Sequence, residues 1–155
     1  MSGNRPVTIR VWRSNQSRQI GHASIEFNSE YVSFWPTSSR REYKKSGPAA
    51  KAFGRADSVW NSYNEDRAEE DGTEDVKVDL YSLNTDSMER ELGTIKAECP
   101  RWSLAGGSGC MNCCQVVQRL LNAGGAEKLA SWPWRMFSVD PNDVADFVQA
   151  ARNKE

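Results

Sequence analysis

One segment near the N-terminus alternates so regularly that it constrains the fold more than any other part of the chain. Apolar and polar side chains alternate through residues 21–27 and again through 30–35, and Asn28-Ser29 separates the two runs. Successive side chains of a strand point to opposite faces, so a two-residue turn makes these runs a β-hairpin with two distinct faces. The apolar face predicts the core side and carries Ala23, Ile25, Phe27, Val32 and Phe34.

The opposite face of this hairpin is rich in groups that can carry chemistry. It holds His22, Ser24, Glu26, Tyr31, Ser33 and Trp35. In the register set by the two-residue turn, His22 lies across from Trp35 and diagonal to Ser33, within reach of longer side chains. Because His22 is the single histidine of the chain, any imidazole chemistry depends on this face.

The remaining pattern is that of a mixed α+β chain. Strands are expected at 8–12, 76–81 and around 136–139, where β-forming residues gather or alternate. Three helices are expected from their capping residues and apolar spacing: from Asp86 to about Cys99, from Asn112 to a left-handed cap at Gly124, and from Asp140 onward. Residues 37–75 are interpreted as excursions and loops, with the acidic run at 65–72 as a solvated turn.

Length and charge exclude several classes of protein. A chain of 155 residues suits a single domain, 1–155, and we expect it to act as a monomer. A formal charge of −1 gives no field that would attract nucleic acid. No apolar run reaches the length of a membrane span, and the first residues lack a signal peptide's apolar core. We therefore expect synthesis in the cytoplasm without that export route.

The four cysteines lie close together in the sequence, at Cys99, Cys110, Cys113 and Cys114. A disulfide-stapled domain spreads its cysteines along the chain, so this cluster indicates a local site, although a Cys99–Cys110 disulfide stays open as an alternative. Cys113 falls in the first turn of the helix after Asn112 and faces the core. The positive end of a helix dipole favours a thiolate there.

A reactive thiolate needs an imidazole partner, and His22 is the one candidate. The glycine-rich stretch 106–109, just before the helix, would let a substrate carbonyl approach the backbone N–H of Cys113. Taken one by one, a helical cysteine and a strand histidine are ordinary structural residues. Together they predict a Cys113–His22 pair for nucleophilic catalysis.

Zinc binding is the competing interpretation of the same residues. Cys99, Cys110, Cys113, Cys114 and His22 supply enough sulfur and nitrogen ligands for a four-coordinate site. A structural zinc site normally shows two separated ligand pairs, whereas Cys113 and Cys114 point about 100° apart on one helix. We therefore expect neither a metal nor another cofactor.

The stretch Asn112-Cys113-x-x-Val116-Val117, followed by Leu120-Leu121, resembles the nucleophile helix of NlpC-type papain-like cysteine hydrolases. Because His22 precedes Cys113, the order resembles the circularly permuted branch, which includes lecithin:retinol acyltransferase-like enzymes. The resemblance covers the hairpin at 21–36 and the helix at 109–125. It implies a papain-like fold with a small antiparallel sheet packed against the nucleophile helix.

The resemblance also implies roles for individual residues. Cys113 would be the nucleophile and His22 its base, while Cys114 matches the motif less well. A third polar residue on the strand after the histidine would orient the imidazole, and Ser33 is the best-placed candidate although it departs from the usual His, Asn or Gln. Trp35 and Trp102 would wall a substrate groove.

The expected function is a cysteine hydrolase that cleaves an amide or ester bond. Relatives of this kind act as cell-wall peptide amidases and endopeptidases, proteases, deamidases or lipid acyl hydrolases. The chain resembles bacterial antagonistic effectors exported by a dedicated secretion system, which favours a peptidoglycan peptide as substrate and an immunity protein as partner. The alternative from another class is a binding domain without catalytic activity.

Overall fold

The computed structural model describes residues 5–14, 21–37, 57–107, 109–133 and 139–155. The expected strand around 136–139 therefore lies outside the described residues except for Val139, and so does the first half of the loop region predicted after Thr37, residues 38–56. Within the described ranges, no helix is long and apolar enough to cross a membrane.

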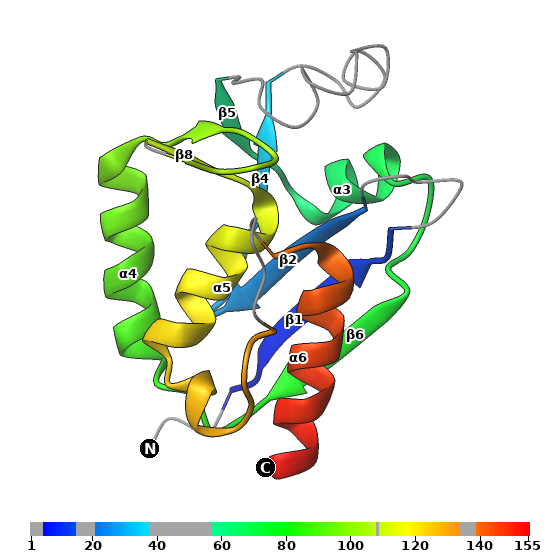
Figure 1. Cartoon of the computed structure of the whole chain (residues 1–155). Coiled ribbons are helices and arrows are strands. Elements are labelled where there is room, and N and C mark those ends of the chain that lie inside the picture. Colours follow the sequence, from blue (N-terminus) through cyan, green and yellow to red (C-terminus); the bar gives the residue numbers. More distant parts are fainter. Residues whose placement is uncertain (1–4, 15–20, 38–56, 108, 134–138) are drawn as a thin grey trace.

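A four-stranded antiparallel sheet forms the centre of the molecule (Figure 1). Its order is β3-β2-β1-β6, and the strands are β1 (Val7–Trp12), β2 (His22–Phe27), β3 (Glu30–Val32) and β6 (Val76–Leu80). The β-hairpin at β2 and β3 has the predicted register, since Ile25 pairs with Val32 and Glu26 with Tyr31. Its turn residues Asn28 and Ser29 both have positive φ, 51° and 64°, as a hairpin turn of this kind requires.

The expected long third strand is divided in two. After β3, the chain leaves the sheet at Ser33, and β4 (Phe34–Pro36) pairs instead with β5 (Ser58–Trp60) in a separate two-stranded sheet. A third small sheet consists of the parallel strands β7 (Arg101–Trp102) and β8 (Cys110–Met111). The division turns the end of the predicted strand out of the main sheet.

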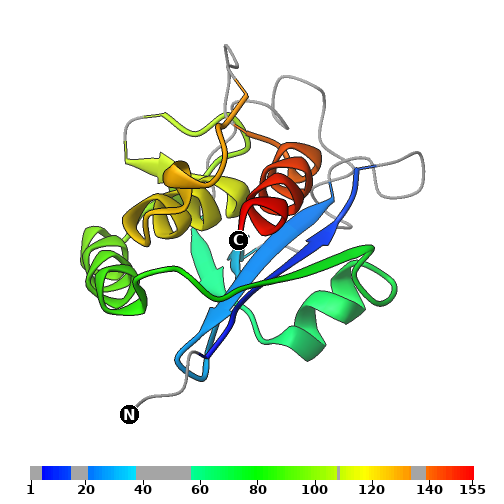
Figure 2. The same ribbon diagram turned by 90° about the horizontal axis from the view of Figure 1, so that it is seen from below.

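The helices cover both faces of the main sheet, as Figure 2 shows. On one face lie α5 (Cys113–Ala123) and α6 (Pro141–Lys154), with α4 (Thr85–Glu98) beside α5. On the other face lies α3 (Tyr63–Glu69), and the short 3₁₀ helix η1 (Ala126–Lys128) follows α5. The fold is thus α+β, with a small antiparallel sheet packed against the helix that carries Cys113.

Three details of the helices differ from the sequence prediction. The N-cap of α4 is Asn84 rather than the predicted Asp86, and the Asn84 side chain accepts a hydrogen bond from the backbone N–H of Ser87. At the end of α5, Gly124 is right-handed and the left-handed glycine is Gly125, with φ 88°. The largest difference is α3, because the sequence pattern predicts a loop in this stretch. Its start at Ser62 has a capping box with Glu65, which satisfies the first free N–H groups of the helix.

One hydrophobic core joins the sheet to α4, α5 and α6. The predicted apolar face of the hairpin is fully part of it, since its five side chains are buried there. Apolar side chains at helical spacing, such as Val117, Leu120, Val144 and Val148, meet them from the helices. This packing fixes the first turn of α5 against the first residues of β2.

Candidate active site

His22 opens β2 and is completely buried. The residue pairs with Trp12 across β1 and β2, and the Trp12 ring lies 5.6 Å from the imidazole between centroids. The Trp35 ring stacks on the imidazole at 4.5 Å, as the predicted hairpin register suggested. Two indole rings therefore fix the plane of the imidazole and keep water away from it.

Asp66 is the centre of a buried polar network on the α3 side of the sheet. Its carboxylate is completely buried, although it belongs to an otherwise mostly exposed helix. It accepts hydrogen bonds from five side chains, which come from β2, from the β3–β4 segment and from the residues just before α3: His22, Tyr31, Ser33, Trp35 and Asn61. A buried carboxylate is tolerated when donors and an opposite charge surround it in this way.

Ser33 bridges the imidazole and the carboxylate. Its hydroxyl donates to Asp66 Oδ1 at 2.8 Å and accepts from His22 Nε2 at 2.8 Å. The same Nε2 lies 3.2 Å from Asp66 Oδ2. The Ser33 hydroxyl, whose own proton goes to Asp66, and the Asp66 carboxylate both accept from Nε2. A proton is therefore held on Nε2.

The network fixes the charge of Asp66. Burial raises the pKa of this carboxyl, but the charge of His22 and its hydrogen bond, with those of Tyr31 and Ser33, outweigh burial and hold the pKa below its ordinary value. Burial and the adjacent carboxylate raise the pKa of Tyr31, which keeps its hydroxyl a donor. Asp66 is thus a carboxylate, and the groups around it are donors.

Cys113 is the first residue of α5. Asn112 sets its position. The Asn112 side chain caps the helix by accepting a hydrogen bond from the backbone N–H of Gln115 at 2.8 Å, and it donates one to the carbonyl of Leu104 at 2.7 Å. The backbone N–H of Ala23, the residue after His22, helps to lower the pKa of the Cys113 thiol. The first turn of α5 therefore meets the first residues of β2.

The Cys113 thiol and the imidazole lie close enough for each to shift the pKa of the other. A hydrogen bond from Cys114 and the charge of His22 hold the pKa of Cys113 well below its ordinary value, against the effect of burial. Burial would lower the pKa of His22, but Asp66 and Cys113 raise it to about 10. The other ring nitrogen, Nδ1, makes no conventional hydrogen bond to any described residue. It is therefore the ring nitrogen that Asp66 and Ser33 do not engage.

The structure brings together the residues predicted for the site, except one. His22, Cys113 and Ser33 form one cluster, and Trp35 belongs to it as a ring stacked on His22 whose Nε1 donates to Asp66 at 2.8 Å. Trp35 is 8% exposed and Trp102 is 3% exposed, on β7. Both are thus mainly buried rather than spread over an open groove wall, and their part in substrate binding stays a prediction.

Asp66 was missed by the sequence prediction. The acidic run containing it was interpreted as a solvated turn, and this is wrong for Asp66 and for Glu70, which is 1% exposed. The Ser62-x-x-Glu65 pattern is the local signal that announces the helix. Nothing in the run itself distinguishes the buried acids from their exposed neighbours.

The four cysteines do not gather around a common centre. All are free thiols; Cys99 is exposed and the other three are buried. Across the described ranges, no group of three or more histidine, cysteine or acidic side chains is arranged to hold a metal ion. The alternative of a zinc site therefore finds no support in the arrangement of these residues.

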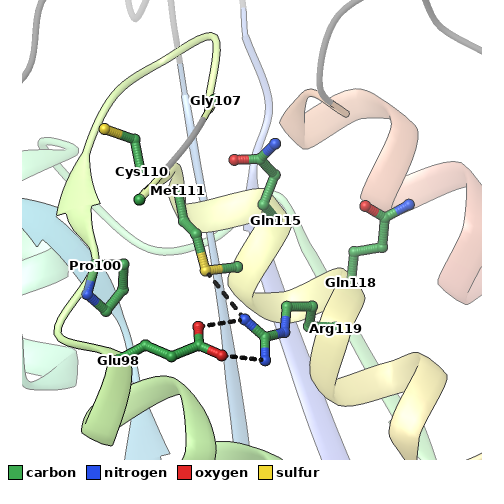
Figure 3. Close-up of a pocket in the computed structure, with 9 residues that line it drawn as sticks. Glu98, Pro100, Gly107, Cys110, Met111, Gln115, Gln118 and Arg119 are labelled. Atoms are coloured by element: carbon green, nitrogen blue, oxygen red, sulfur yellow. Dashed lines mark hydrogen bonds and ion pairs between the residues drawn. The ribbon is translucent and has the colours of Figure 1, made fainter.

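An open pocket of about 640 Å³ lies beside α5 (Figure 3). Gln115, Gln118 and Arg119 line it from α5, and residues of β8, the preceding loop and the end of α4 complete it. At 100° per residue, these three positions lie on the side of the helix opposite Cys113. The pocket and the Cys113–His22 pair thus occupy two different faces of α5.

A family model matches most of the chain. The IcsB middle domain matches residues 50–155, a range that contains Asp66 and Cys113 and begins after His22. No curated protein and no solved structure matches the chain. Because the matched range covers more than half of the 155 residues, the chain belongs to the IcsB middle-domain family.

Proposed function

We propose that this protein is a cysteine hydrolase of permuted papain-like architecture that cleaves an amide or ester bond. The observation that carries the proposal is the completely buried imidazole of His22, which is hydrogen-bonded to Asp66 and lies close enough to Cys113 for each to shift the pKa of the other. A thiolate, an imidazolium and a carboxylate in this order supply a nucleophile, a proton carrier and a group that orients the carrier. Two buried charges beside a thiol are costly as mere structural elements.

In the proposed reaction, the Cys113 thiolate attacks the substrate carbonyl and forms a carbon–sulfur bond. The first N–H groups of α5 have no partner inside the helix and lie where the developing oxyanion needs donors. His22 then gives its Nδ1 proton to the leaving amine or alkoxide, and the bond to that group breaks. Water then attacks the thioester carbonyl while His22 takes a proton from it. The carbon–sulfur bond breaks, the carboxylic acid product leaves, and the Cys113 thiolate and the protonated His22 are restored.

The roles of the remaining residues follow from their contacts. Asp66 and Ser33 hold Nε2, which leaves Nδ1 as the ring nitrogen that exchanges a proton with Cys113 in the proposed reaction. Trp35 keeps the ring in its plane. Among the three ionised residues, Cys113 alone retains exposed surface, at 8%. The substrate carbonyl would therefore enter from the thiol side.

We test the nucleophile by limiting iodoacetamide labelling across pH, with fragment-ion mass spectrometry to assign each cysteine. We expect Cys113 to label fast at pH values well below those an ordinary thiol needs, because its thiolate is stabilised. His22→Ala should remove this acid-side labelling, and Cys99→Ser, at an exposed cysteine, should leave it unchanged. Slow labelling spread over all cysteines and insensitive to His22→Ala would contradict the proposal and favour a non-catalytic binding domain.

The proposed substrate class is a peptidoglycan peptide, with delivery as an antagonistic effector and an immunity protein as inhibitor. This step rests on the resemblance to small effector hydrolases. Purified muropeptides should be cleaved by the wild-type protein and not by Cys113→Ala. If Cys113 is reactive but muropeptides stay intact, the cell-wall substrate is wrong, and peptide, amide and lipid ester substrates are the next classes to test.

A further inference from the structure

Cys114 is the buried nucleophilic group that the proposed mechanism leaves unused. It follows Cys113 directly in α5 and is 2% exposed. The two sulfur atoms are 3.8 Å apart, within the range of a hydrogen bond between a thiol and a sulfur. One thiol can donate in this contact, and the surroundings of the two residues decide which.

The surroundings of Cys113 favour the thiolate. His22 and the backbone N–H of Ala23 act on it from β2, and both lower its pKa. Both groups stabilise a negative charge. Cys113 is therefore the acceptor in the contact between the two cysteines.

The surroundings of Cys114 favour the neutral thiol. Its acidic neighbours are Asp140 and Asp143, which act on it from the start of α6. These two carboxylates cap each other's backbone N–H groups, at 2.8 and 3.1 Å, and so are fixed in place. Burial and the two negative charges raise the pKa of Cys114.

We propose that Cys114 is a positioning residue, a permanently protonated thiol that donates a hydrogen bond to the Cys113 thiolate. The inference rests on the proposed function and deepens it, because it gives the adjacent cysteines opposite roles. α6 contributes to the surroundings of Cys114 through Asp140 and Asp143. Cys114 would never be the nucleophile, since a neutral buried thiol attacks carbonyls poorly.

The test compares Cys114→Ala with Cys114→Ser, which differ by one hydroxyl. The rate of Cys113 alkylation is measured against pH for both, with fragment ions to locate the label. We expect Cys114→Ala to slow Cys113 labelling about tenfold on the acid side of the profile and to shift the midpoint upward, because a donor to the thiolate is lost. Cys114→Ser should keep the rate within about twofold of the wild type, since the hydroxyl can still donate.

Controls separate this inference from the function itself. Cys110→Ala, at a buried cysteine on the pocket side of α5, should leave the profile of Cys113 unchanged. If either Cys114 variant fails to fold, the isosteric pair Cys114→Val and Cys114→Thr makes the same comparison. Identical profiles for the Ala, Ser and wild-type proteins, or equal shifts in both variants, would overturn the role of Cys114. If His22→Ala instead leaves the pH profile of Cys113 labelling unchanged in a protein with an intact Cys114, the proposed function itself is overturned.

Discussion

The two faces of α5 carry ionic clusters that differ in their exposure to water. On the outer face, Arg119 pairs with Glu91 and Glu98, and the three side chains are between 29% and 49% exposed. On the inner face, Cys113 meets His22, which pairs with a completely buried Asp66. Charges in water cost little to place and contribute little, whereas buried charges cost several kcal/mol unless each is paired.

The comparison identifies the inner cluster as the part of the fold whose charges cost free energy to bury. Replacing a buried ion pair by apolar residues is often neutral or stabilising, so stability alone does not account for the inner cluster. Its members come from β2, the β3–β4 segment, α3 and α5, which are far apart in the sequence. The proposed catalytic role would account for the convergence of these elements on charged groups rather than on apolar ones.

The largest effect is expected for Asp66→Ala. The substitution leaves a buried imidazolium without its carboxylate and several donors without an acceptor. We expect the free energy of unfolding to fall by about 3–5 kcal/mol, measured by denaturant titration at pH 7. A loss below about 1 kcal/mol would show that the inner cluster is no more costly to break than a surface pair.

A smaller loss is expected for Trp35→Phe. The change removes the Nε1 donor to the Asp66 carboxylate but keeps an aromatic ring to stack on His22. A hydrogen bond to a charged group contributes about 1.5–3 kcal/mol, and we expect destabilisation of that order. Trp60→Phe is the matched control, because Trp60 is 37% exposed and lies outside the network. Equal effects of both substitutions would contradict a special role for the buried indole.

The stability of the inner cluster should also depend on acid. The pKa of Asp66 lies below its ordinary value of 3.8, so its contribution is complete above that pH and is lost as the pH falls through the lowered pKa. The gap in unfolding free energy between wild type and Asp66→Asn should therefore narrow toward low pH. Urea titrations of both proteins from pH 7 to pH 3 measure this gap, and a constant gap would refute the assignment.

The smallest effect is expected on the outer face. Arg119→Ala removes both salt bridges of the outer cluster, yet we expect a loss of less than about 1 kcal/mol that shrinks further in high salt. Thermal unfolding at low and high ionic strength measures it. A loss as large as that of Asp66→Ala, unaffected by salt, would erase the distinction between the two faces.

Local sequence patterns could predict the site residues that lie on the hairpin and at the start of α5. The alternation around Asn28-Ser29 places His22, Ser33 and Trp35 on one face, because strand side chains follow a period of two. Asn112 marks the start of α5 and therefore the place of Cys113. The mixed α+β class and the small antiparallel sheet follow from the same patterns.

Asp66 could not be found in the same way. It belongs to a seven-residue helix in an acidic stretch, and its burial results from contacts with a hairpin more than thirty positions earlier in the chain. The composition of the stretch around Asp66 does not indicate such long-range contacts. The departure of β4 from the main sheet is equally nonlocal, since it depends on pairing with β5.

The central claim is that His22 is held as a cation between the Asp66 carboxylate and the Cys113 thiolate. Because the chain has one histidine, long-range proton–nitrogen NMR of the imidazole reports on this residue without ambiguity. The account predicts an imidazolium that persists through neutral pH, with a titration midpoint near the pKa of about 10 that falls in Cys113→Ala. A neutral imidazole at pH 7, or a midpoint near the ordinary 6.5 that Cys113→Ala leaves unchanged, would contradict it.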